Sequence, residues 1–166
     1  FLIAGPGSPG LIDRHGQLHR CAGRGFPISD LGSGAWLGLR AIQQSLLCHD
    51  GILPPSLLAV RLLDHFKRDQ AEVVRWAARA IPADYGRFAP WVFDAASDGD
   101  ELANQLLDET CAQLQTLLEG MGLLGADRIA LLGGVGMRLA PRLGHLNLVP
   151  PQADALEGAI LFAQSK

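Results

Sequence analysis

The sequence predicts an α/β protein in which a five-stranded mixed sheet is flanked by helices. Short apolar segments separated by glycine-bearing turns occupy residues 1–25, a helical period of apolar residues dominates residues 33–122, and strand-like segments return at residues 128–132 and 146–149. Strands that begin as a hairpin and are later joined by helices combine antiparallel with parallel pairing, so the sheet should be mixed. The chain of 166 residues is long enough for one such domain.

Residues 1–4, 11–13 and 17–22 form the first three predicted strands. The first is a continuous apolar run, typical of a strand buried on both faces, and the other two should pair as an antiparallel hairpin. We expect the first strand to lie between this hairpin and the strand at 128–132, with only the strand at 11–13 antiparallel to the rest. Because the chain opens on Phe1 inside a strand, we also expect it to be an excised part of a longer protein.

Apolar residues recur at helical spacing through the middle of the chain. Helices are predicted over residues 33–50, 56–66, 73–78, 88–96 and 100–121. Ser56 and the acidic segment 98–100 are predicted to provide helix caps, and Pro90 should either lie in the first turn of its helix or kink it. The three tryptophans, Trp36, Trp76 and Trp91, accompany apolar residues, so we expect them to pack in the core and not to stack on a sugar.

The strand period returns at residues 128–132 and runs directly into Gly133-Gly134. A short connection, without a helix, should lead to a fifth strand at 146–149, which ends at two prolines. Asp154 and Glu157 then resemble a capping box, which predicts a final helix through residue 163.

Composition excludes several classes of protein. Seventeen acidic against fourteen basic residues give a net charge of −3, which leaves no positive excess for binding nucleic acid. No apolar run reaches the roughly 18 residues of a membrane span and no signal peptide is recognisable, so we expect a cytoplasmic protein without a membrane segment. The three cysteines are far apart and should be reduced core thiols, and the five histidines lack metal-ligand spacing, so no protein metal site is expected.

Glycines gather in three passages that follow or precede predicted strands. In Gly5-Pro6-Gly7-Ser8 the backbone N–H groups and the Ser8 hydroxyl suit an anion such as phosphate, although a plain hairpin turn has the same composition. Gly133-Gly134-Val135-Gly136 lies at the carboxyl end of a strand, where open α/β sheets bind ligands.

The third passage, residues 23–38, is polar and glycine-rich and leads directly into a helix. Asp30 stands where a carboxylate either caps that helix or faces a ligand. Capping accounts for one acidic residue but not for the glycines around it, which indicate that the backbone passes close to another group.

Taken in order, these passages resemble a known family. Residues 21–38 are similar to the Gly-Gly-Trp-Gly-x-x-x-Gly-Asp-Glu-Gly-Ser-x-x-Trp-Ile-Gly signature of N-acetylglucosamine and glucosamine kinases, members of the BadF/BadG/BcrA/BcrD-type ATPase family within the actin, Hsp70 and sugar kinase superfamily. Residues 5–8 resemble its second phosphate loop, residues 94–104 its Ala-x-x-Gly-Asp-x-x-Ala segment, residues 131–135 its adenosine loop and residues 151–163 its closing segment.

The resemblance implies that residues 1–166 are the C-terminal lobe of a two-lobe kinase with a ribonuclease H-like sheet. It implies nucleotide binding by Gly5, Gly7, Ser8, Gly133 and Gly134, and binding of an amino sugar by Gly23, Arg24 and Asp30. ATP with Mg²⁺ would be used to form the sugar 6-phosphate. The general base and the first phosphate loop of the family precede the matching region, so this chain holds no catalytic residue or metal ligand and should be inactive alone.

Four departures from the family pattern leave the substrate open. Pro6 replaces threonine, Arg24 replaces tryptophan, Ser29 replaces glycine and Leu31 replaces glutamate. Arg24 either favours an anionic substrate or points into solvent.

Two other functions are compatible with the same resemblance. One is an ATPase activator of an acyl-CoA dehydratase or reductase, which would need interface cysteines for an iron–sulfur cluster. The other is a non-catalytic sensor of sugar or nucleotide, which Pro6 and Leu31 favour. A homodimer is left open.

Overall fold

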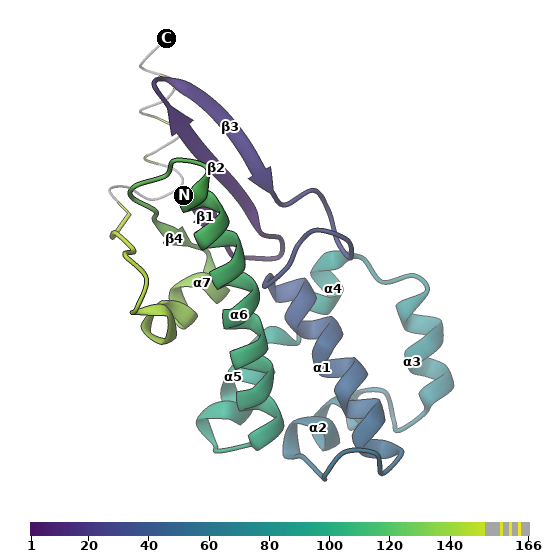
Figure 1. The fold of residues 1–166 in the computed structure, drawn as a ribbon. Helices are drawn as coiled ribbons and strands as arrows, with labels where there is room; N and C mark the ends of the chain where they lie inside the picture. Colours follow the sequence, from purple (N-terminus) through teal and green to yellow (C-terminus); the bar gives the residue numbers. More distant parts are fainter. Residues whose placement is uncertain (152–156, 158–159, 161–162, 164–166) are drawn as a thin grey trace.

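The computed structural model describes residues 1–151 together with 157, 160 and 163, and it arranges one four-stranded mixed sheet beside a group of helices (Figure 1). The strands are β1 (Leu2–Ile3), β2 (Pro9–Arg14), β3 (Gln17–Ala22) and β4 (Leu131–Leu132). The helices are α1 (Gly34–His49), α2 (Leu57–His65), α3 (Gln70–Ala77), α4 (Pro82–Gly86), α5 (Ala89–Ser97), α6 (Glu101–Leu123) and α7 (Gly134–Leu139), with a 3₁₀ turn at Ala140–Leu143.

The order of strands in the sheet is β3-β2-β1-β4. Leu2 of β1 lies opposite Gly10 of the antiparallel β2 and opposite Leu131 of the parallel β4. The six paired positions of β2 and β3 form the predicted hairpin. The predicted neighbours and directions of these strands are therefore confirmed, with β2 alone running against the others.

The prediction of a fifth strand at residues 146–149 is wrong. This segment makes one parallel bridge, between Leu148 and Ile129, beside the four-stranded sheet. The N–H groups of Leu146 and Leu148 instead donate to Leu143 and Leu146 within the turn. The prolines that follow have no N–H group, so pairing cannot extend beyond Val149.

Two short helices were not predicted. Glycines at 133, 134 and 136 disfavour a helix locally, yet α7 forms because Val135 N–H and Gly136 N–H both donate to the Ala4 carbonyl oxygen, at 3.0 Å each. In α4, Pro82 occupies the first turn, where its missing N–H group costs nothing, instead of ending a helix before it.

The other described helices begin at the predicted capping residues or within three residues of the predicted start. Ser56 Oγ accepts from Ala59 N–H at the start of α2, as predicted. Of the two positions expected for Pro90, the structure has the first turn of α5. The helix predicted over residues 154–163 falls mostly outside the described residues.

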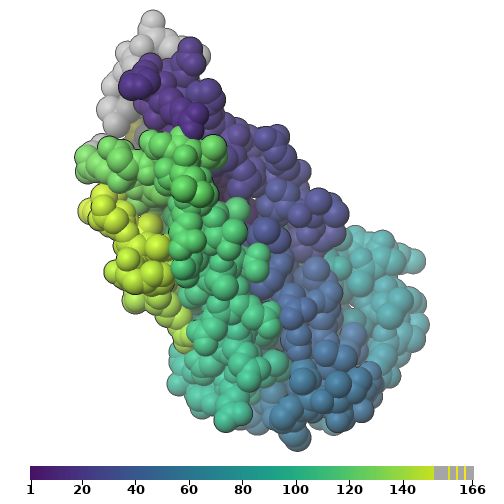
Figure 2. Space-filling view, viewed as in Figure 1, coloured from purple at the N-terminus to yellow at the C-terminus, as the bar shows by residue number. Residues whose placement is uncertain are grey.

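One continuous apolar core joins the sheet to the helices. Helix α1 contacts α2, α4, α5 and α6, and α6 extends along one face of the molecule beside it (Figure 2). At the sheet, Met121 of α6 lies close to Gly10 of β2. The three tryptophans are partly buried and pack against this core, as predicted.

Helices α1 and α4 touch through backbone at Gly38. A Cβ atom on Gly38 would lie 1.9 Å from the Tyr85 carbonyl oxygen and 2.6 Å from its carbon. Because backbone cannot yield as a flexible side chain does, Gly38→Ala is expected to lower the free energy of unfolding by about 1–3 kcal/mol. Urea denaturation of the complete protein measures the change.

Gly120→Ala is the matched control, because Gly120 lies in α6 with no atom within 4 Å of the added Cβ. This variant should raise the free energy of unfolding by up to about 1 kcal/mol, since alanine is the better helix former. Equal stability of the two variants would contradict the close approach of α1 and α4.

Candidate functional site

The loop Gly5–Ser8 connects β1 to β2 and is held against two other glycine-rich passages. Gly34 N–H, in the first turn of α1, donates to the Gly5 carbonyl oxygen at 2.7 Å. The Ala4 carbonyl oxygen, directly before the loop, accepts from the first turn of α7. The sheet therefore brings three passages that are far apart in sequence to one point.

Gly133 allows this close approach. Its φ is +85°, and a Cβ atom there would lie 2.5 Å from the Ala4 carbonyl oxygen. A side chain is excluded both by the backbone conformation and by the space. Gly133 therefore supports the turn between β4 and α7.

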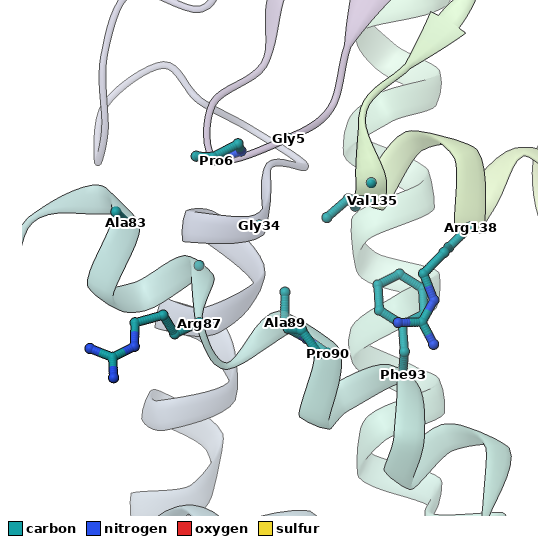
Figure 3. A pocket seen from close by; sticks show the side chains of 12 residues that line it. Gly5, Pro6, Gly34, Ala83, Arg87, Ala89, Pro90, Phe93, Val135 and Arg138 are labelled. Atoms are coloured by element: carbon teal, nitrogen blue, oxygen red, sulfur yellow. The ribbon is translucent and has the colours of Figure 1, made fainter.

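A cavity of about 390 Å³ opens beside these loops (Figure 3). Backbone of four glycines forms part of its wall, at Gly5, Gly34, Gly86 and Gly134. The remainder is mostly apolar, with Pro6, Ala83, Ala89, Pro90, Phe93 and Val135. An apolar chamber that meets glycine-rich backbone suits a ligand with a flat organic part and an anionic part.

Arg87 and Arg138 are the charged residues that line the cavity, and sequence reasoning missed both. Arg138 lies in α7, which was not predicted, and Arg87 lies between α4 and α5. The Arg87 guanidinium is 3.8 Å from the Asp84 carboxylate, whereas the Arg138 guanidinium carbon lies over the Phe93 ring, 4.1 Å from its centroid. In the sequence, the positive charge of Arg138 follows the glycine-rich passage 133–136 closely, and this was the available signal. That Arg138 lines the cavity depends on the fold.

Asp30 is buried and lies against the loop Gly5–Ser8. Its Oδ1 accepts from Ser8 N–H at 3.3 Å, and a Cβ atom on Gly7 would lie 3.2 Å from the same oxygen. The cap of α1 is Ser33, whose Oγ accepts from Trp36 N–H at 3.1 Å. Of the two roles left open for Asp30, helix capping is therefore wrong.

Ser8 is fully buried. Within the part of the chain that the structure describes, its Oγ is a buried side-chain oxygen without a hydrogen-bond partner. Such a group is destabilising by about 1–3 kcal/mol and calls for a physical reason. Ser8 does not line the cavity itself, so its hydroxyl lies enclosed beside the loop.

Gly23 packs against Pro9, the residue that follows the same loop, whereas Arg24 faces solvent. A Cβ atom on Gly23 would lie 2.2 Å from Pro9 Cα, and the Gly23 carbonyl oxygen accepts from the Arg20 guanidinium. The Arg24 side chain is exposed, and its backbone N–H donates to Ser29 Oγ at 3.2 Å. The serine that departs from the family pattern thus stabilises the turn between residues 24 and 29.

The cysteines are free, and each is half-buried instead of fully buried in the core as predicted. Burial, followed by the negative charge of Asp100, raises the pKa of the Cys48 thiol, and burial is also the main cause that raises the pKa of Cys111. The described residues contain no group of three or more side chains suited to a metal ion. Nor does any helix among them have the length and apolar character needed to cross a membrane.

Several known proteins resemble this chain over most of its length. The sequence profile of the BadF/BadG/BcrA/BcrD ATPase family matches residues 1–163. A glucosamine kinase, GspK, of Vibrio cholerae is 44% identical over 98% of this chain and 56% of its own length. An N-acetyl-D-glucosamine kinase of Dictyostelium discoideum is 29% identical over 76% of this chain and 42% of its own length.

A solved structure has the same fold. The crystal structure of a "putative N-acetylglucosamine kinase" from Chromobacterium violaceum superposes with a TM-score of 0.83 at 33% identity. The superposition includes 96% of this chain and 57% of the Chromobacterium chain. The chain therefore spans about half the length of the relatives it matches.

Proposed function

The chain belongs to the BadF/BadG/BcrA/BcrD ATPase family, and on that premise we propose that it is the C-terminal lobe of an ATP-dependent amino-sugar kinase. The substrate is glucosamine or N-acetylglucosamine, which is converted to its 6-phosphate in the cytoplasm. The kinase names of the relatives and the shorter length of this chain support the assignment. The four-stranded sheet would be the ribonuclease H-like sheet of the superfamily.

One observation carries this proposal: the Asp30 carboxylate lies 3.3 Å from the backbone N–H of Ser8. A carboxylate accepts charge-assisted hydrogen bonds from two adjacent sugar hydroxyls, and the loop that holds Ser8 suits a phosphate. A sugar bound at Asp30 would therefore lie next to the phosphates of a nucleotide. Phosphoryl transfer depends mainly on such positioning and on stabilisation of charge.

The cavity is assigned to the nucleoside of ATP. Its apolar wall suits a base and a ribose, and Gly133 and Gly134 lie at the turn into α7 beside it. The phosphates would then lie toward Gly5, Gly7 and Ser8, and a small opening of the loop would give the buried Ser8 hydroxyl a partner. Mg²⁺ would be held by the ATP phosphates and the other lobe, because one carboxylate beside backbone amides does not form a magnesium site.

The test is ADP release by the complete protein with glucosamine and with N-acetylglucosamine. We expect release that depends on one of these amino sugars, with glucose as the control. Binding of ATP and sugar without release of ADP would support the sensor function instead. An iron–sulfur chromophore in the purified protein would support the activator of an acyl-CoA dehydratase.

Gly7→Ala should impair use of the sugar although Gly7 belongs to the proposed phosphate loop. The added Cβ would lie 3.2–3.3 Å from the three carboxylate atoms of Asp30, so the carboxylate must move. Misplacement of a substrate-binding group lowers rates steeply, and we expect kcat/KM for the sugar to fall roughly tenfold. Steady-state kinetics of the complete protein with varied sugar at saturating ATP measure this change.

Gly120→Ala is the control outside the site, because its added Cβ in α6 meets no atom within 4 Å. Its sugar kcat/KM should stay within about twofold of wild type, because no neighbouring atom has to move. If both variants lose the same activity, the contact between Gly7 and Asp30 is not the cause.

A further inference from the structure

The cavity has two chemically different ends. The loop Gly5–Ser8 and the first turn of α1 bound one end, and Ala89, Pro90 and Phe93 of α5 bound the other (Figure 3). The first end offers backbone polar groups close to Asp30, and the second offers apolar side chains. A nucleotide whose phosphates lie at the first end would therefore direct its base toward α5.

Arg138 covers the Phe93 ring at this second end. Its guanidinium carbon lies 4.1 Å from the ring centroid, and Phe93 itself is buried. Among the described residues, the Arg138 guanidinium has no carboxylate within ion-pair distance and no hydrogen-bond acceptor, whereas Arg87 lies 3.8 Å from Asp84. The ring of Phe93 is thus what positions the Arg138 side chain.

A guanidinium held on an aromatic ring still has a second face. The group is planar and delocalised, and it stacks on aromatic surfaces as well as bonding anions. Arg138 is exposed and lines the cavity, so its second face is accessible to a ligand. A flat heterocycle would complete a three-layer stack of Phe93, Arg138 and base.

We propose that Arg138 is a base-binding residue that stacks on the purine of the bound nucleotide and favours ATP over pyrimidine nucleotides. The inference rests on the proposed function for the location of the phosphates. A purine presents a larger surface than a pyrimidine to the same guanidinium, so the stack is stronger. Arg138 therefore selects the base, while the glycine-rich loop binds the phosphates.

The test is direct binding of ATP, CTP and inorganic tripolyphosphate to the complete protein, measured by calorimetry without sugar. Arg138→Lys keeps the positive charge and removes the plane of the guanidinium. We expect it to weaken ATP binding about tenfold, a typical loss for one stacked base. Tripolyphosphate binding should stay within about twofold, and the preference for ATP over CTP should shrink.

Arg87→Lys is the matched control, because Arg87 lines the same cavity but is paired with Asp84. It should leave the preference for ATP over CTP unchanged. Phe93→Leu keeps an apolar side chain and removes the ring, so it should reproduce the loss of base preference in a protein whose melting temperature confirms folding.

Three results would overturn the inference. Equal weakening of ATP and tripolyphosphate by Arg138→Lys would make Arg138 a phosphate contact, and unchanged ATP affinity would remove it from the site. Failure of the wild-type protein to bind any nucleotide would overturn the proposed function as well. A protein that binds ATP with this base preference but phosphorylates no amino sugar would leave the stack standing and contradict only the kinase.

Discussion

Asp30→Asn in the complete protein is expected to lower kcat/KM for the amino sugar by about one to two orders of magnitude. The substitution keeps the shape but replaces an anionic acceptor with a neutral amide, so a sugar hydroxyl would face an NH₂ group instead of an oxygen. Hydrogen bonds to charged groups contribute roughly 1.5–3 kcal/mol each, and about 1.4 kcal/mol corresponds to a factor of ten. Steady-state kinetics with varied sugar measure the loss.

The structure separates this effect from a loss of folding. The amide oxygen of asparagine still accepts from Ser8 N–H, and Ser33, not Asp30, caps α1. Melting temperature and ATP affinity should therefore remain close to those of wild type. Asp127→Asn is the control, because Asp127 is an exposed carboxylate on the connection before β4. Sugar kinetics of Asp30→Asn within a factor of two of wild type would contradict the sugar-binding role.

Asp100→Ala should produce the largest loss of stability. The Asp100 carboxylate joins the beginnings of two helices, because it accepts from Ala103 N–H of α6 at 2.9 Å and from Leu57 N–H of α2 at 2.8 Å. It also accepts from Leu58 N–H at 3.2 Å and from Ser56 Oγ, itself the cap of α2, at 2.9 Å. Alanine would leave buried donors at both helices without an acceptor.

The expected decrease in the free energy of unfolding is about 3–5 kcal/mol, since several bonds to one charged group are lost together. Urea denaturation of the complete protein, followed by tryptophan fluorescence, measures it. Asp98→Ala is the control, because Asp98 is exposed and lies two residues away. A loss below about 1 kcal/mol, the size expected for an ordinary single cap, would show that Asp100 does not join the two helices.

The same carboxylate makes the stability depend on pH. Burial acts most strongly on Asp100 and pushes its pKa upward, but the hydrogen bonds from Ala103, Ser56, Leu58 and Leu57 together outweigh it and leave the pKa below the ordinary value of 3.8. A lowered carboxyl pKa stabilises the folded protein above the unfolded value, and this contribution disappears as the pH falls through the folded value. The difference in stability between wild type and Asp100→Ala should be full above about pH 5 and should decrease below pH 3.8.

The sequence by itself determined the features that depend on neighbouring residues. Ser56 and Asp100 marked the beginnings of helices because a capping bond spans only a few residues, and the hairpin of β2 and β3 followed from two strands around a tight turn. The order of the glycine-rich passages was also sufficient for the resemblance to the kinase family, which the comparisons confirm.

Only the tertiary structure decided the features that depend on distant residues. Helix α7 exists because the Ala4 carbonyl oxygen binds its first turn, and the fifth strand does not form because the N–H groups of Leu146 and Leu148 bond within a local turn. Asp30 meets Ser8 across 22 residues of sequence, and Arg138 meets Phe93 from a different helix. Local periodicity reflects the geometry of a single element, whereas these contacts form only when sheet pairing and helix packing bring separate elements together.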